Sequence, residues 1–206
     1  MAKPKKSYHH GDLRHSLLLA AEKLLEQNGV GAVSLRDVAK KAGVSHTAPY
    51  RHFVDKQALL AGLANVGFGR LADAMEQCVT THPQSPREQL SASAHAYVGL
   101  AIRHPQMTNL MFGGVLAKDE CPEELAQQSD RAFNGLLRII KNGQQAGLYI
   151  EKESMDLALF VWSLAHGFSM LISAGQLGNV VSDEKLVQDM VSNLSGMVAT
   201  GIVKRE

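Results

Sequence analysis

The sequence has little of several features that other classes of protein need. It contains only two cysteines, Cys78 and Cys121, far apart and without a metal-ligand spacing, so no disulfide scaffold is expected. No run reaches the roughly 18 uninterrupted apolar residues of a membrane span, and the N-terminus lacks the apolar core of a signal peptide. We therefore predict a cytoplasmic protein with reduced, structural thiols, while a redox pair stays an alternative.

Motifs of common enzyme classes are also missing. The chain has no glycine-rich phosphate loop, no His-Glu-x-x-His motif for zinc and no Glu-x-x-His pair of the kind a helical di-iron site uses. Among the nine histidines, only His9 and His10 are close in sequence. We expect no catalytic site, no cofactor and no bound metal.

The distribution of charge is more informative than the total. The 206 residues carry a net charge of +1, but residues 1–60 hold ten Lys/Arg against five Asp/Glu, a net +5, and the remainder holds eleven against fifteen, a net −4. A basic N-terminal part on an acidic body is typical of a protein that places one end on a polyanion. Chance clustering of solvated side chains is the alternative.

Residues 33–53 carry the pattern of two short helices joined by a tight turn. Ser34 and Asp37 have the spacing of a capping box, and the apolar residues that follow recur at helical intervals. Gly43 stands where the first helix has to stop and turn. Ser45 is placed to cap a second helix, His46 to His52, with Pro49 near its first turn. This pattern predicts a helix-turn-helix.

The local sequence resembles one family closely. The runs Asp-Val-Ala-Lys-Lys-Ala-Gly-Val-Ser at 37–45, Tyr-Arg-His-Phe at 50–53 and Asp-Lys-Gln-Ala-Leu-Leu at 55–60 are similar to the DNA-binding domain of the tetracycline-repressor (TetR) family. The resemblance covers about residues 11–71. It implies an all-helical homodimeric repressor that binds a palindromic operator on double-stranded DNA and leaves it when a small-molecule effector binds the C-terminal domain.

The resemblance also implies roles for individual residues. Phosphates would be held mainly by Arg36, Tyr50, His52 and Lys56, and bases would be contacted mainly by His46, Thr47 and Ala48. The predicted DNA-binding residues are Ser34, Arg36, Ser45, His46, Thr47, Ala48, Tyr50, Arg51, His52 and Lys56.

The helical periodicity predicts an all-α fold of about nine helices. We expect a flexible basic arm at 1–10, a DNA-binding domain at 11–71 with its helix-turn-helix at 34–53, and a regulatory and dimerisation domain at 72–206. The expected helices are a first one capped by Asp12, then 35–42, 46–52, 56–79, 86–103, 106–112, 122–145, 154–174 and one from Ser182 onward.

The last two expected helices are more apolar than a single-chain core requires, which favours a four-helix dimer interface. The predicted interface residues are Leu157, Phe160, Leu164, Phe168, Leu171, Leu186, Met190, Leu194 and Met197. Thioether and aromatic groups on the middle helices are suited to an adaptable ligand pocket. The predicted pocket residues are His95, Tyr97, Met107, Met111, Phe112, Phe133, Trp162 and His166.

The segment Trp162-Ser-Leu-Ala-His-Gly resembles a Trp…His-Gly pattern of one type of C-terminal domain in the TetR family. His166 is accordingly either a donor in the pocket or a histidine satisfied in the dimer interface. Two other functions remain open from the sequence: a helical adaptor that binds another protein, and a metal- or redox-responsive sensor.

Overall fold

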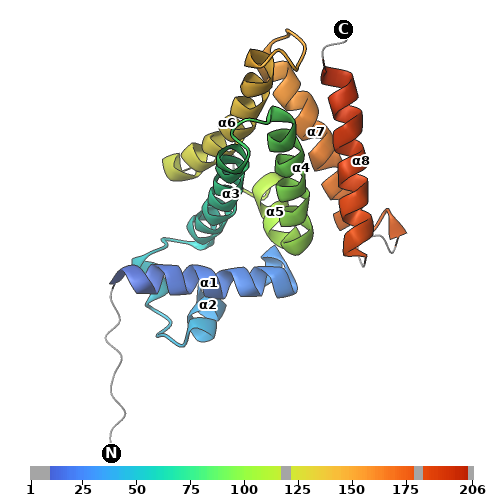
Figure 1. Ribbon diagram of the computed structural model, residues 1–206. Helices are drawn as coiled ribbons and strands as arrows, with labels where there is room; N and C mark the ends of the chain where they lie inside the picture. Colours follow the sequence, from blue (N-terminus) through green and yellow to red (C-terminus); the bar gives the residue numbers. More distant parts are fainter. Residues whose placement is uncertain (1–9, 117–121, 179–182, 204–206) are drawn as a thin grey trace, which may run out of the picture. The chain divides into compact units, whose positions relative to one another are not determined.

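The computed structural model describes residues 10–116, 122–178 and 183–203, and this part of the chain is helical (Figure 1). Its only bridge of β type is an isolated antiparallel one between Tyr149 and Val203. The elements are the helices α1 (His10–Asn28), α2 (Leu35–Ala42), α3 (Lys56–Thr81), α4 (Pro86–Arg103), α5 (Pro105–Phe112), α6 (Glu123–Gln145), α7 (Ser154–Ser173) and α8 (Glu184–Ile202), with the 3-10 turns η1 (Val30–Ala32) and η2 (Pro49–Arg51).

The all-α prediction is confirmed, with two local corrections. The described residues form eight α-helices, because the segment expected as a helix over 46–52 is only the short turn η2. The first helix begins at His10, so Asp12 is its third residue and does not precede it as a cap. Cys121 and residues 1–9 lie outside the described residues.

The chain divides into two compact units. The first contains the residues up to Val66 together with 106–122, and the second contains 67–105 and 123–206. This division differs from the predicted boundary at residue 71 in one important respect, since most of α5 belongs to the first unit. The helix α3 is continuous through the boundary.

The first unit is built around a buried apolar layer that α1, α2 and the start of α3 share. Leu17, Leu25, Val38 and Leu59 are all fully buried. α1 and α3 approach closely at Gly62, where an added Cβ would lie 3.1 Å from the Phe53 ring and 3.3 Å from Leu18. An alanine there would require the Phe53 ring and the Leu18 side chain to shift by a few tenths of an ångström.

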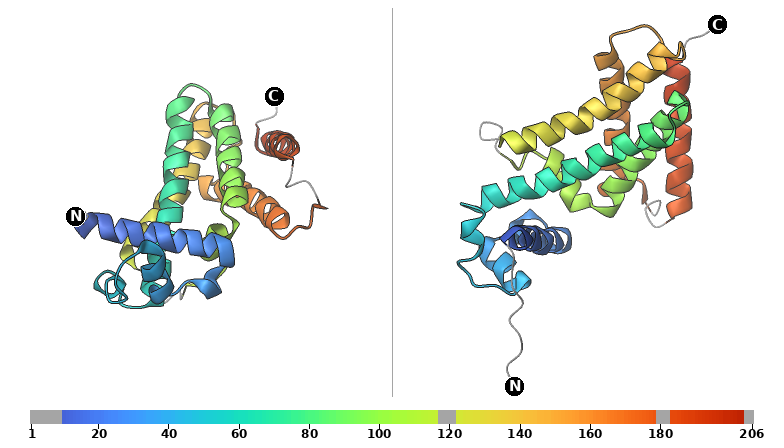
Figure 2. Two further views of the ribbon diagram at one scale, coloured as in Figure 1. Left: turned by 90° about the horizontal axis from the view of Figure 1, so that it is seen from below. Right: turned by 60° about the vertical axis from the view of Figure 1, so that its left-hand side comes forward.

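The second unit is arranged around α4, which packs against α6, α7 and α8. In the left view of Figure 2, α8 is seen nearly along its axis beside α4. One buried cluster joins α3, α4, α6 and α7 around Ile139, Ile140 and Tyr149. A second joins α4 and α7 to α8 around Val98, Phe168 and Val191.

Two contacts fix α6 on the second half of α3. A Cβ at Gly135 would lie 2.6 Å from the Cβ of Met75, so this crossing requires glycine. Nearby, the Arg131 guanidinium bridges Asp73 at 2.5 Å and Glu76 at 3.2 Å. All three of these side chains are exposed, so the ion pairs contribute little beyond orienting the helices.

α7 is the one described helix long and apolar enough, by length and composition alone, to cross a membrane. Only 28% of its most apolar stretch is buried in the single chain. Asp156, Ser163, His166 and Ser169 interrupt this stretch, so it contains no uninterrupted run of 18 apolar residues. α7 therefore has an apolar face that the chain itself leaves uncovered.

Candidate nucleic-acid interface

The helix α2 begins and ends where the sequence predicts. The Ser34 hydroxyl accepts a hydrogen bond of 3.1 Å from the Asp37 amide and donates one of 2.5 Å to the Asp37 carboxylate, which confirms the capping pair. At the other end, Gly43 has φ 71° and ψ 31°, the left-handed conformation that favours glycine. The chain reverses here because the Val44 amide then bonds back to the Ala39 carbonyl at 3.0 Å.

The segment after this turn is tighter than an α-helix. The Ala48 amide donates to the Ser45 carbonyl and the His52 amide to the Pro49 carbonyl, which is the i+3 to i pattern of a 3-10 helix. One hydrogen bond there has the i+4 to i pattern of an α-helix, from the Phe53 amide to the Pro49 carbonyl. Pro49 has no N–H to continue an α-helical ladder, and the Ser45 and Thr47 hydroxyls bond each other at 3.2 Å instead. The result is one helical turn that presents its side chains on a short, curved segment.

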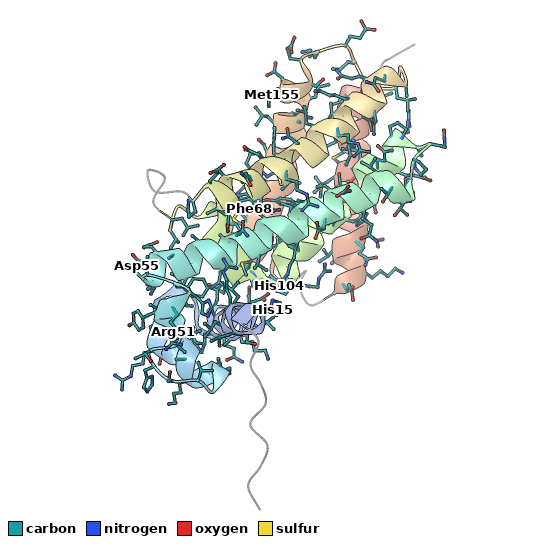
Figure 3. The ribbon with its side chains drawn as sticks, turned by 90° about the vertical axis from the view of Figure 1, so that its left-hand side faces the viewer. His15, Arg51, Asp55, Phe68, His104 and Met155 are labelled. Atoms are coloured by element: carbon teal, nitrogen blue, oxygen red, sulfur yellow. The ribbon has the colours of Figure 1, made fainter. Side chains whose placement is uncertain are left out.

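The turn buries its apolar residues and exposes its polar ones. Pro49 and Phe53 are buried, and the Arg14 guanidinium lies 5.5 Å from the centre of the Phe53 ring. Tyr50 is 58% exposed although it is an aromatic residue. Figure 3 shows the side chains of this region at the surface of the first unit, with Arg51 and Asp55 labelled.

The predicted DNA-binding residues divide by exposure. The exposed ones are Arg36, Ser45, His46, Thr47, Tyr50 and Arg51, and the half-buried ones are Ser34, Ala48, His52 and Lys56. The exposed set surrounds the turn between α2 and η2, so the structure brings together hydroxyl, imidazole, phenol and guanidinium groups on one short segment. These are the donor groups that contact phosphates and base edges.

Lys56 has a structural partner that the sequence does not show. Its ammonium donates a hydrogen bond of 3.0 Å to the Val30 carbonyl, so it ties the start of α3 to η1. An ammonium has three donors, which leaves two N–H groups for a phosphate. Asp55 caps α3, since its carboxylate accepts a 2.8 Å bond from the Ala58 amide.

Three exposed side chains beside this surface are absent from the predicted site. Lys40 and Lys41 lie on the last turn of α2, and Val54 is 82% exposed between η2 and α3. Lys40 and Lys41 lie within the run at 37–45 that resembles the TetR family. Their positive charge is the feature of the sequence that could indicate contact with DNA. An exposed valine has no such signal in the sequence.

The second unit brings four of the predicted pocket residues together. The Tyr97 hydroxyl lies 2.8 Å from Nδ1 of His166 and accepts a 3.4 Å bond from the Trp162 indole N–H. The Trp162 ring meets those of His166 and Phe133 at centroid distances of 6.1 and 5.9 Å. Residues from α4, α6 and α7 therefore share one polar and aromatic cluster, which we call the Tyr97 cluster.

The indole N–H of Trp162 can only donate, so the Tyr97 oxygen accepts from it. The donor in the Tyr97–His166 bond depends on the tautomer of His166. Burial raises the pKa of Tyr97 to about 12, with the Trp162 hydrogen bond opposing. Burial also lowers the pKa of His166 from its ordinary value, which favours the neutral imidazole.

The other predicted pocket residues lie elsewhere. Met107, Met111 and Phe112 belong to the first unit, where Met107 and Met111 are buried in its core. His95 is in the second unit, but its Nε2 lies 3.2 Å from the Ser192 hydroxyl on α8. Sequence spacing could not separate these residues from the Tyr97 cluster, because it does not show which helix faces which.

The predicted interface residues also divide. Leu157 and Phe168 are buried within the chain's own core, and Met190 and Leu194 are half-buried. Phe160, Leu164 and Leu171 on α7 are exposed between 41% and 48%. On α8, Leu186 is 42% and Met197 is 68% exposed. Figure 3 labels Met155, a further exposed apolar residue at the start of α7.

These features define an all-α protein with a helix-turn-helix unit, and comparison with known proteins gives its family. Residues 17–63 match the family model described as "Bacterial regulatory proteins, tetR family", and residues 90–194 match that of the "Tetracyclin repressor-like, C-terminal domain". The second match alone covers half of the chain. The chain belongs to the TetR family.

Individual relatives agree with this assignment. The uncharacterised HTH-type transcriptional regulator YobS of Bacillus subtilis is 33% identical over 156 residues, which are 75% of each chain. The regulator EthR of Mycolicibacterium smegmatis is 29% identical over 96 residues, 46% of this chain and 44% of EthR.

Solved structures show the same fold. A protein of unknown function from Rhodococcus sp. RHA1 is 35% identical, with a TM-score of 0.84 over 97% of this chain and all of that one. The TetR-family regulator PfmR of Thermus thermophilus has a TM-score of 0.69 at 20% identity, over 89% of this chain and 97% of PfmR.

Family membership supports the first of the functions that the sequence left open. The protein is a DNA-binding transcriptional regulator and not an enzyme. Regulators of this family act as dimers.

Proposed function

We propose that the protein is a cytoplasmic, homodimeric repressor that binds a palindromic operator and is released by a small molecule. The observation that carries this proposal is the exposed polar turn at residues 45–51, held on a buried and capped frame. Because the frame fixes the turn, two copies related by a two-fold axis can present it to two half-sites of an operator.

The residues of the turn have separate roles in this proposal. Arg36 and Tyr50 are exposed and contact phosphates, with Ser34, His52 and Lys56 beside them. His46, Thr47 and Ala48 contact base edges, where the Thr47 and Ala48 methyl groups suit the thymine methyl. The η2 turn is short, so sequence preference is concentrated in these few side chains.

The dimer is formed by the apolar faces of α7 and α8. Phe160, Leu164 and Leu171 supply the centre of the interface, and Leu186 and Met197 supply its edge. Leu157 and Phe168 support this surface from inside the chain and do not cross the interface, because each is less than 9% exposed already in one chain. Covering the exposed side chains supplies the apolar burial that holds the two chains together.

The Tyr97 cluster is the part of the predicted pocket that the proposal retains. Tyr97, Trp162 and His166 combine apolar rings with polar tips, a composition suited to small-molecule binding. The resemblance of the segment Trp162-Ser-Leu-Ala-His-Gly to the Trp…His-Gly type of C-terminal domain supports this proposal. A molecule that competes for the His166 imidazole changes the α4 to α7 contact, and α7 carries the dimer face.

The test is footprinting of the full chain on the DNA that flanks its own gene, with and without a panel of small molecules. The expected result is a protected palindrome that at least one molecule releases. A matched control replaces Tyr50 by Ala, since this variant keeps the buried frame. A protected DNA sequence without two-fold symmetry would contradict the proposal that a homodimer binds two half-sites.

A further inference from the structure

A groove of about 370 Å³ runs between α4 and α8 in the second unit. We call it the α4–α8 groove. Its floor is formed by Val98 and Ile102 of α4 and by Val187 and Val191 of α8. The three valines are almost fully buried and belong to the cluster around Phe168. The floor is therefore apolar and fixed by packing on its inner side.

The α4 wall of the groove contains one cation at a defined position. A Cβ at Gly99 would lie 3.0 Å and 3.4 Å from the two terminal nitrogens of Arg103. The guanidinium therefore folds back over the backbone of Gly99, one turn before it, and a side chain at Gly99 would require it to shift by a few tenths of an ångström. Within the described residues Arg103 has no ion-pair partner, so its charge is open to a ligand.

The remaining polar groups mark the limits of the groove. His95 lies one turn before Gly99 on α4, and its bond to the Ser192 hydroxyl connects α4 to α8. On α8, the groove is lined by Gln188 and by Glu184 in the first turn. The titratable groups that line the groove are therefore His95, Arg103 and Glu184.

We propose that the α4–α8 groove binds a monocarboxylate with an apolar body. A guanidinium pairs with a carboxylate through two parallel hydrogen bonds, which a neutral ligand cannot reproduce. The apolar body lies along the floor of Val98, Ile102, Val187 and Val191. The volume falls in the range of about 300–1,000 Å³ that small-molecule sites occupy.

This site is distinct from the Tyr97 cluster, and binding is measured without DNA. The inference therefore does not depend on the proposed repressor function, and either can fail alone. Where both hold, occupation of the groove acts on α8, which carries Leu186 and Met197 of the proposed dimer face.

The experiment is isothermal titration of the full chain with decanoate and with decanamide, which has the same apolar body without the charge. The wild type is expected to bind decanoate at least about tenfold more tightly, the ratio that one charged pair supplies. Arg103→Gln is expected to remove this preference. Arg87→Gln, an exposed arginine at the start of the same helix and outside the groove, is the matched control and should retain it.

Gly99→Ala separates a binding defect from a folding defect. The new methyl group shifts the guanidinium by a few tenths of an ångström but keeps its charge, and alanine favours the helix more than glycine does. We expect decanoate to bind several-fold more weakly to a variant whose Tm does not fall.

The sign of the Glu184→Gln effect tests the charge of the ligand. Removing this carboxylate should tighten decanoate binding, because it removes a like charge from the groove. A zwitterion such as leucine, in contrast, should lose affinity. The proposal is overturned if decanoate and decanamide bind equally, if neither binds, if Arg103→Gln leaves decanoate affinity unchanged, or if leucine binds better than decanoate and Glu184→Gln weakens it.

Discussion

The carboxylate of Glu26, near the end of α1, accepts a hydrogen bond of 2.9 Å from the backbone amide of Met107 at the start of α5. The neighbouring Gln106 amide donates a second one of 3.3 Å. A negative side chain thus satisfies two N–H groups at the positive end of a helix far away in the sequence. This pair holds α5 in the first unit, although α5 follows α4 directly in the chain.

Replacing Glu26 by Ala should therefore destabilise the first unit. The expected loss is about 1–2 kcal/mol in the free energy of unfolding, because two helix-terminal amides lose a charged acceptor. Urea unfolding followed by circular dichroism measures this loss. Gln27→Ala is the control on the same turn, since Gln27 is exposed, and it should have almost no effect.

Replacing Ser195 by Ala should stabilise the protein, in contrast to the change at Glu26. Its hydroxyl oxygen is buried without a hydrogen-bond partner among the described residues. It lines a cavity of about 30 Å³ whose other lining side chains are apolar, so a water would find too few partners there. Ser195→Ala should raise stability by about 1 kcal/mol. Ser192→Ala, on the same helix, removes the bond to His95 and should lower it.

The lowered pKa of His166 gives a prediction for pH dependence. The unfolded chain takes up a proton at about pH 6.5, whereas the folded chain does so at a lower pH. Between these two values the unfolded state binds more protons, so stability is complete above about pH 6.5 and falls as the pH decreases. Urea midpoints at a series of pH values should show this fall. In His166→Gln the fall should be smaller, and an equally steep fall would exclude His166 as its cause.

The exposed apolar side chains of α7 predict the oligomeric state. Leu164→Glu combined with Leu171→Glu should give monomers, because two carboxylates would have to be buried at the interface. Sedimentation velocity measures the change in mass. Leu19→Glu is the control, since Leu19 is 42% exposed on α1 in the other unit. If the double variant sediments as a dimer of unchanged stability, the interface lies elsewhere.

Much of the fold could be predicted from local sequence. Caps and breakers act within a few residues, and so Ser34 and Gly43 lie at the ends of α2 as predicted. The expected helix at 86–103 likewise has the bounds of α4, with Ser85 and His104 at its ends. The expected helix at 46–52 is wrong for a local reason as well. Pro49 near the first turn is compatible with an α-helix, but the hydroxyl pair before it and the missing N–H leave only a 3-10 turn.

The site was predicted less completely, because its contacts are between distant residues. Periodicity placed Leu157 and Phe168 on apolar faces but could not show that these faces meet the chain's own core. Nothing local indicates that Lys56 would bond the Val30 carbonyl, or that Glu26 would cap α5. The Tyr97 cluster joins residues about seventy positions apart, and only the packing of α4 on α7 brings them together.

The central claim is that the turn at residues 45–51 binds DNA, and the affinity of Tyr50→Ala for the footprinted operator tests it most directly. Fluorescence anisotropy over a range of salt concentrations should show wild-type affinity falling by about 0.9 in log K per phosphate contact per decade of salt. Tyr50→Ala should bind about tenfold or more weakly, with circular dichroism and dimer mass unchanged. Val54→Ala should retain most of the affinity. A folded, dimeric Tyr50→Ala protein that binds the operator as tightly as the wild type would contradict the account.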